Sequence, residues 1–240
     1  MKFQEEKLLA LKYLSLSNNL ENSDIRTIAA KHKEHCVLIS DYAQGIAYIN
    51  RKERKLIIVF SSMCYNLHCF VANVERTHLV PSYSNFNSPV RVNSDILFSY
   101  KSIRETLIKF ARDKRVAFDT VLVAGHSYGG AVATLCATDM QYNVAMSVTC
   151  ITSGSPRVGN KHFVKSFNRR IMTSYRFVVR NDTIPMLPSL ISGYSHVKGH
   201  IKLGALSISD IICKLFNRGV IVTDIKESHY FKHYEEELKK

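Results

Sequence analysis

The stretch Val121-Leu-Val-Ala-Gly-His-Ser-Tyr-Gly-Gly-Ala131 joins a short apolar run to a run of small residues through the pattern Gly-x-Ser-x-Gly. The apolar run predicts a buried strand, and the small residues after it predict a helix. A serine on the tight turn between them exposes its hydroxyl, and side chains two residues before and after it would collide, which favours Gly125 and Gly129 there. The stretch therefore makes Ser127 a candidate nucleophile. Its alternative interpretation is a glycine-rich turn that only packs a helix on a sheet.

Strand and helix patterns alternate along most of the chain. The predicted strands are residues 36–40, 45–49, 56–60, 121–124, 146–152, 176–179 and 197–203. The predicted helices are residues 1–33, with Asn22 or Ser23 as a cap, and residues 96–110, 131–140, 161–168, 208–216 and 224–238. Alternation of this kind predicts an α/β fold with a largely parallel central sheet. The polar residues 75–94 predict a long loop.

Length and composition fit an ordinary globular chain. The 240 residues are 46% hydrophobic and 22% charged, which suits one large domain or at most two small ones. We expect an N-terminal helical segment, residues 1–33, followed by a single domain, residues 34–240. No apolar run approaches the roughly 18 residues of a membrane-spanning helix. Residues 1–7 carry acids where a signal peptide would be basic and then apolar, so we expect an intracellular protein, either soluble or peripheral to a membrane.

The cysteines and the charge narrow the chemistry further. The six cysteines show no paired Cys-x-x-Cys spacing, which favours buried thiols over disulfides or a structural zinc site. The net charge of +13 favours acidic partners such as an anionic membrane surface, nucleic acid or an acidic protein. Because the Lys and Arg residues are mostly dispersed and no nucleic-acid motif is present, we expect no nucleic-acid partner.

A serine nucleophile needs a base, and the base needs an acid that orients it. In an α/β fold of this kind the order along the chain is serine, acid, histidine. Asp182 follows the predicted strand 176–179, at the end of a parallel strand where such sheets place their sites; an Asx turn is its alternative role. Four histidines follow it: His196, His200, His229 and His233. The last two lie one helical turn apart, but the glutamate of a zinc hydrolase and a third ligand are missing, so we expect no metal and no cofactor.

Several segments, taken in order, resemble the class 3 lipase family of fungal triacylglycerol lipases and plant acylhydrolases. They are Gly125-His-Ser-Tyr-Gly-Gly130, Thr152-Ser-Gly-Ser-Pro-Arg-Val-Gly-Asn160, Arg180-Asn-Asp-Thr-Ile-Pro-Met-Leu-Pro188, Tyr194-Ser-His-Val197 and Ser228-His-Tyr-Phe-Lys-His-Tyr234. The resemblance runs from about residue 36 to residue 238. It implies an α/β-hydrolase fold, a mostly parallel sheet flanked by helices, with a lid segment.

The resemblance also implies the site residues. It places the family's catalytic acid at Asp182 and gives the histidine of Tyr194-Ser-His-Val197 a structural role. A histidine followed five residues later by a tyrosine, as in plant members, selects His229 as the base, with His233 as the alternative. The predicted triad is therefore Ser127, Asp182 and His229.

The sequence departs from the family pattern after the strand 56–60. The family's Phe-Arg-Gly-Ser/Thr is Phe60-Ser-Ser-Met63 here. The resemblance implies that the Met63 and Tyr128 amides form the oxyanion hole, but Met63 has no hydroxyl to add. The loss of one oxyanion donor costs roughly 10²–10³ in rate. The family's His-x-Gly-Phe stretch is likewise replaced by Asn93-Ser-Asp-Ile96.

Residues 64–74 would be the lid helix. Its apolar stripe consists of Leu67, Phe70, Val71 and Val74, with Phe70 where the family has a tryptophan. Such a stripe could pack on the core or turn toward lipid, and basic charge would draw the protein to an anionic membrane surface.

These observations predict a cofactor-independent serine hydrolase that cleaves a lipid ester through an acyl-enzyme. The alternative, suggested by the altered Ser61-Ser-Met63 stretch, is a catalytically weakened or inactive lipase-fold module that binds membranes or a protein partner.

Overall fold

The computed structural model describes residues 2–61, 77–79, 89–144, 147–180, 182–204 and 229–240. A seven-stranded sheet forms its centre, in the order β1-β2-β3-β6-β7-β9-β11. Its strands are β1 (His35–Ile39), β2 (Gln44–Asn50), β3 (Lys55–Phe60), β6 (Thr120–His126), β7 (Ser147–Ser153), β9 (Thr173–Val179) and β11 (His200–Leu203). The first three strands pair antiparallel, and β3, β6, β7, β9 and β11 run parallel. The predicted α/β fold with a mostly parallel sheet is confirmed.

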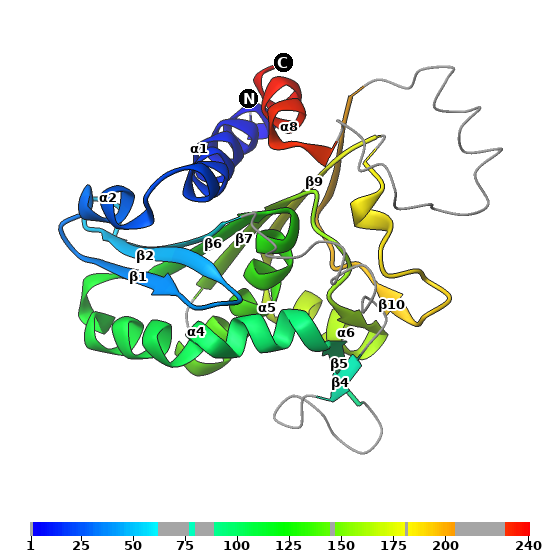
Figure 1. The fold of residues 1–240 in the computed structure, drawn as a ribbon, viewed down its shortest axis with the longest axis horizontal. Helices are drawn as coiled ribbons and strands as arrows, with labels where there is room; N and C mark the ends of the chain where they lie inside the picture. Colours follow the sequence, from blue (N-terminus) through cyan, green and yellow to red (C-terminus); the bar gives the residue numbers. More distant parts are fainter. Residues whose placement is uncertain (1, 62–76, 80–88, 145–146, 181, 205–228) are drawn as a thin grey trace.

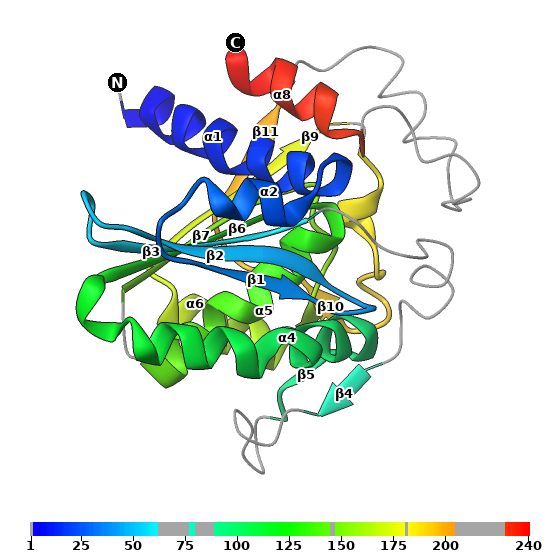
Figure 2. The same cartoon turned by 60° about the vertical axis from the view of Figure 1, so that its left-hand side comes forward.

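Helices cover both faces of this sheet (Figures 1 and 2). One face carries α1 (Lys2–Asn22), α2 (Ile25–Ala30) and α8 (Phe231–Lys239), and the other carries α4 (Ser94–Asp113), α5 (Ser127–Val144) and α6 (Lys161–Arg170). The first and last helices, α1 and α8, lie side by side, with α1 over β3, β6 and β7 and α8 over β9 and β11. None of the helices in the described part of the chain has the length and apolarity that crossing a membrane requires.

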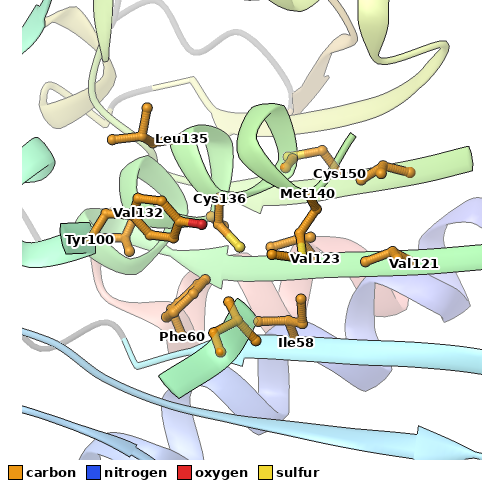
Figure 3. Packing of buried hydrophobic residues seen from close by; sticks show 14 of the residues in the cluster. Ile58, Phe60, Tyr100, Val121, Val123, Val132, Leu135, Cys136, Met140 and Cys150 are labelled. Carbon is orange, nitrogen blue, oxygen red and sulfur yellow. The ribbon is translucent and has the colours of Figure 1, made fainter. Parts of the chain in front are cut away.

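The side chains of β3 explain this layering. Leu56, Ile58 and Phe60 belong to the core under α4 and α5, whereas Ile57 and Val59 belong to the core under α1 and α8. A strand that is apolar on both faces needs cover on both sides, as in parallel sheets generally. Figure 3 shows the α5 side of this packing, with Ile58 and Phe60 beneath the helix.

A small second sheet lies beside α4 and α6. It consists of β10 (Tyr194–Ser195), β8 (Gly159–Asn160), β5 (Arg91–Asn93) and β4 (Thr77–Leu79), in that order. The prediction of a continuous loop over residues 75–94 is therefore wrong at β4 and β5. Strands of two or three residues leave no periodic pattern to detect.

Other boundaries also differ from prediction. Asp24, rather than Asn22 or Ser23, caps α2, because its carboxylate accepts hydrogen bonds from the amides of Arg26 and Thr27. The helix predicted from residue 131 already begins at Ser127, and α8 begins at Phe231. The helix predicted over residues 208–216 lies outside the described residues.

Candidate active site

The turn between β6 and α5 holds Ser127 in an unusual backbone conformation. Its φ of +53° lies in the left-handed region that residues other than glycine rarely adopt. A β-carbon at Gly125 would lie 2.3 Å from the carbonyl oxygen of Gly129, and one at Gly129 would lie 2.2 Å from that of Ser61. Neither position has room for a side chain. The turn is therefore a tight elbow that holds its serine under local strain.

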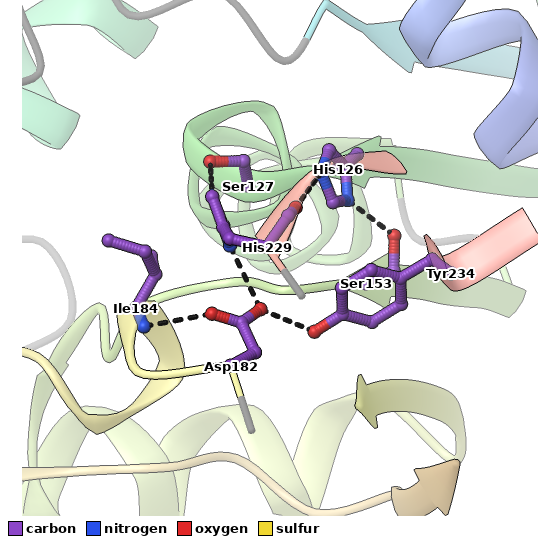
Figure 4. A network of polar contacts seen from close by, with 7 residues as sticks. All are labelled: His126, Ser127, Ser153, Asp182, Ile184, His229 and Tyr234. Atoms are coloured by element: carbon purple, nitrogen blue, oxygen red, sulfur yellow. Dashed lines mark hydrogen bonds and ion pairs between the residues drawn. The ribbon is translucent and has the colours of Figure 1, made fainter. Parts of the chain in front are cut away.

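Three side chains from distant parts of the chain meet at this elbow (Figure 4). Ser127 Oγ lies 2.7 Å from His229 Nε2, and His229 Nδ1 lies 2.9 Å from Asp182 Oδ2. All three residues are buried. A carboxylate can only accept, so Nδ1 of the imidazole donates to Asp182, and Nε2, when it carries no proton, accepts from the serine hydroxyl. This arrangement leaves the serine ready to give up its proton.

The carboxylate of Asp182 is itself held from two sides. Its Oδ1 accepts a hydrogen bond of 2.9 Å from the Ile184 amide, which is the Asx turn expected as its alternative role. Its Oδ2 also accepts a hydrogen bond of 2.5 Å from the Tyr234 hydroxyl. Burial, together with the neighbouring carboxylate, raises the pKa of Tyr234 well above its ordinary value, so the phenol remains a donor. The Asx turn and the contact with His229 therefore coexist.

A second histidine, His126, contacts the backbone of His229. Its Nε2 lies 3.1 Å from the backbone carbonyl of His229, and its Nδ1 lies 2.8 Å from Ser153 Oγ. Burial lowers the pKa of His126 to about 3, with the nearby ring of His229 as the second cause. The ring is therefore neutral. Because a carbonyl only accepts, Nε2 carries the proton, and Nδ1 accepts from Ser153.

Gly154 packs closely against Asp182, His126 and His229. Its φ is +60°, and a β-carbon there would lie 3.1 Å from Asp182 Oδ2 and 3.2 Å from Cε1 of His229. Sequence reasoning did not assign a role to Gly154, His126 or Ser153. The only signal for Gly154 was its place in the family-like stretch 152–160.

Hydrogen bonds from the side chains of Arg157 and His196 hold the loop that follows Asp182. Arg157 donates hydrogen bonds to the carbonyls of Met186 and Pro188, and its amide donates to that of Leu187. His196 Nε2 lies 2.6 Å from the carbonyl oxygen of Pro185. Burial, and next the charge of Arg176, lowers the pKa of His196 to about 3. A neutral His196 with a proton on Nε2 therefore braces this loop.

The other predicted site residues lie as follows. His233 is half-exposed on α8, with Nδ1 3.9 Å from a carboxylate oxygen of Glu236. Tyr128 is buried in the first turn of α5, and its hydroxyl lies 2.7 Å from Ser99 Oγ. Met63 and the lid residues Leu67, Phe70, Val71 and Val74 lie outside the described residues. Within the described ranges, no group of three or more His, Cys, Asp or Glu side chains is arranged to hold a metal ion.

Comparison with known proteins places these features in context. The model of the family described as Lipase (class 3) matches residues 62–191. Secreted mono- and diacylglycerol lipase A of Penicillium cyclopium is 38% identical over 102 residues, which are 41% of this chain and 33% of that protein. Phospholipase A1-II 5 of Oryza sativa subsp. indica is 31% identical over 131 residues, 50% of this chain and 27% of that protein. The chain thus spans about a third or less of the length of the curated relatives it matches.

Solved structures agree on the fold. The triacylglyceride lipase of Rhizomucor miehei superposes with a TM-score of 0.70 at 21% identity, covering 95% of this chain and 94% of that one. A second solved structure, of a triacylglycerol lipase whose catalytic centre is described as a serine protease triad, also gives a TM-score of 0.70 at 21% identity, covering 92% of each chain. The predicted α/β-hydrolase fold is confirmed.

The expectation of an intracellular protein is wrong. Both the Penicillium cyclopium relative and a Fusarium solani relative, 39% identical over 75 residues (31% of this chain and 22% of that protein), are secreted lipases. The expectation treated the acids of residues 1–7 as evidence about export. In the structure they are part of α1, where Glu6 accepts a hydrogen bond from Tyr175.

Proposed function

We propose that this chain, which belongs to the class 3 lipase family, hydrolyses a lipid ester through a serine nucleophile. The observation that carries the proposal is the continuous line of hydrogen bonds from Ser127 through His229 to Asp182, on a strained elbow at the end of β6. These residue types with these contacts perform acyl transfer in unrelated folds, and the order serine, acid, histidine along the chain is that of α/β-hydrolases.

In the proposed reaction Ser127 Oγ attacks the acyl carbonyl carbon while His229 Nε2 takes the hydroxyl proton. The imidazolium formed keeps its proton on Nδ1, which donates a hydrogen bond to Asp182, and the charge of this carboxylate stabilises the ring. Collapse of the tetrahedral intermediate breaks the bond to the alcohol, which receives the proton from Nε2, and leaves an acyl-enzyme. A water molecule, deprotonated by the same nitrogen, then releases the carboxylic acid and restores Ser127.

The oxyanion would be held at the start of α5. In the proposal the Tyr128 amide supplies one hydrogen bond, the Met63 amide supplies another, and the helix N-terminus adds a positive dipole end. Sequences with a hydroxyl at the position of Met63 have one more donor than this chain. We therefore propose a working hydrolase with a lower maximal rate than a chain with that hydroxyl.

The proposed substrate class is an acyl ester of a lipid, because relatives are named mono- and diacylglycerol lipases and a phospholipase A1. The proposed lid stripe of Leu67, Phe70, Val71 and Val74 would turn toward the lipid. The charge of +13 supports contact with an anionic membrane surface. Which lipid is preferred would follow from turnover of matched glyceride and phospholipid vesicles.

A fluorophosphonate probe tests the proposal directly, since it reacts selectively with activated serines. The wild-type chain is expected to be labelled and to hydrolyse a short-chain p-nitrophenyl ester, and Ser127→Ala should abolish both. Ser166→Ala removes another buried serine hydroxyl, on α6, and should leave both intact. A folded wild-type chain that neither reacts with the probe nor turns over the ester would contradict the proposal and favour a binding module without turnover.

A further inference from the structure

Ser17 lies in α1 and is completely buried, at 0% exposure. Its Oγ is 2.5 Å from the carbonyl oxygen of Phe60 and 3.0 Å from the amide nitrogen of His126. Since a carbonyl only accepts and an amide N–H only donates, the hydroxyl donates to Phe60 and accepts from His126. A serine inside a helix often bonds to the carbonyl one turn before it. Here both partners belong to the central sheet.

The two partners mark the last rung between β3 and β6. Phe60 ends β3, His126 ends β6, and the parallel register pairs Phe60 with Gly125. Beyond this rung β3 and β6 no longer pair. The amide of Ser61 donates to Gln44 of β2, at 2.8 Å, and His126 passes the chain to the elbow. The hydroxyl of Ser17 thus ties together two backbones at the point where their paths separate.

These two backbones lead to both halves of the proposed oxyanion hole. The chain after β3 continues through Ser61 to Met63, and the chain after β6 continues through Ser127 to Tyr128. Space between them is minimal, because a β-carbon at Gly129 would lie 2.2 Å from the Ser61 carbonyl oxygen. A small change in the separation of the strand ends would therefore move the first turn of α5, with the Tyr128 amide, relative to Ser61.

We propose that Ser17 is a positioning residue for the hydrolysis proposed above: its hydroxyl sets the spacing between the end of β3 and the residue that precedes the nucleophile. This inference rests on the proposed function. It makes the N-terminal helix part of the catalytic unit, although Ser17 stands 109 residues from His126 along the chain.

The test compares Ser17→Ala with Ser166→Ala, which removes a buried hydroxyl away from the strand ends. For each full-length variant, kcat and KM are measured with a short-chain p-nitrophenyl ester, together with the rate of fluorophosphonate labelling and the thermal unfolding midpoint. Hydrogen exchange of the His126 amide is followed by NMR as a readout independent of activity.

We expect Ser17→Ala to lower kcat and the labelling rate about 10-fold or more, because small displacements of reacting groups have large effects on rate. KM should change less than about two-fold, the His126 amide should exchange faster, and Ser166→Ala should match the wild type in kcat and labelling. Should Ser17→Ala fail to fold, Ser17→Cys keeps one heavy atom on the β-carbon but makes it a weaker donor and acceptor. It should show the same changes to a smaller extent.

The inference is overturned if a folded Ser17→Ala keeps wild-type kcat, labelling and exchange, or if it loses no more activity than Ser166→Ala. An effect confined to KM would overturn it too. In those cases the wild type is still labelled and the proposed function stands. A folded wild type that shows neither labelling nor turnover removes the proposed function, and this inference with it.

Discussion

Gly129→Ala tests how tightly the elbow is built. A β-carbon there would lie 2.2 Å from the carbonyl oxygen of Ser61, 2.8 Å from its carbonyl carbon and 2.9 Å from the carbonyl oxygen of Phe60. All three are backbone atoms, so no rotation of a side chain relieves the contact. Real β-carbons essentially never approach within 3.0 Å. The first turn of α5 and the end of β3 must therefore separate by at least 0.8 Å, the difference between 3.0 and 2.2 Å.

That displacement should affect activity more than stability. Misplacing reacting groups by about 1 Å costs on the order of 10²-fold in rate. Overpacking costs about 1–3 kcal/mol of unfolding free energy, and alanine in a helix returns about 1 kcal/mol relative to glycine. We expect kcat to fall about 100-fold while the free energy of unfolding falls by about 2 kcal/mol or less.

The assay combines ester turnover, fluorophosphonate labelling and urea unfolding. Gly193→Ala is the matched control, because a β-carbon at Gly193 has no atom within 4 Å although its φ is +81°. The control introduces backbone strain without a collision and should keep wild-type kcat. A folded Gly129→Ala variant with kcat within about three-fold of the wild type would refute the reasoning.

Two further predictions concern the groups around His229, the proposed base. Tyr234→Phe removes the hydrogen bond to Asp182. Because hydrogen bonds to charged groups contribute about 1.5–3 kcal/mol, urea unfolding should show that the free energy of unfolding falls by about 2 kcal/mol. The control Tyr230→Phe, at an exposed tyrosine, should show no loss, and equal losses in the two variants would contradict the role of the Tyr234 hydroxyl. The pKa of His126, about 3 when folded and about 6.5 when unfolded, means that protons bind preferentially to the unfolded chain. The contribution of the neutral His126 ring to the free energy of unfolding is fully present above about pH 6.5. It falls by up to about 1.4 kcal/mol per pH unit as the pH drops toward 3. Urea unfolding at pH 7, 6 and 5 should therefore show that the free energy of unfolding changes less with pH for His126→Asn than for the wild type. The same dependence on pH in both proteins would count against a buried neutral ring.

Local sequence patterns were sufficient to predict the elbow and most of the sheet. The turn around Ser127 depends on residues within a few positions, and the apolar runs of β3 and β6 are long enough to identify. The α2 cap was harder, because Asn22, Ser23 and Asp24 all suit that role. Only the backbone shows that Asp24 accepts the two amide hydrogen bonds. The division into residues 1–33 and 34–240 stays a prediction.

Residues that act through long-range contacts could not be predicted from local patterns. Ser17 is an ordinary serine in a helix until α1 is placed over the ends of β3 and β6. The choice among the four later histidines likewise needed the family resemblance, since spacing alone left His229 and His233 equal. Their environments differ sharply once the chain is folded, because His229 is buried against Asp182 and His233 is half-exposed beside Glu236.

The proposed base, His229, is held by contacts that its proposed chemistry does not disturb. The backbone carbonyl of His229 is bound by His126, whose burial keeps it neutral and whose proton stays on Nε2 because a carbonyl cannot donate. The ring is bound at Nδ1 by Asp182, which Tyr234 and the Ile184 amide hold in turn. In the proposed reaction only Nε2 gains and loses a proton. The imidazole can therefore cycle between its two charge states without any of its supports exchanging a donor for an acceptor, which is the condition for a preorganised site.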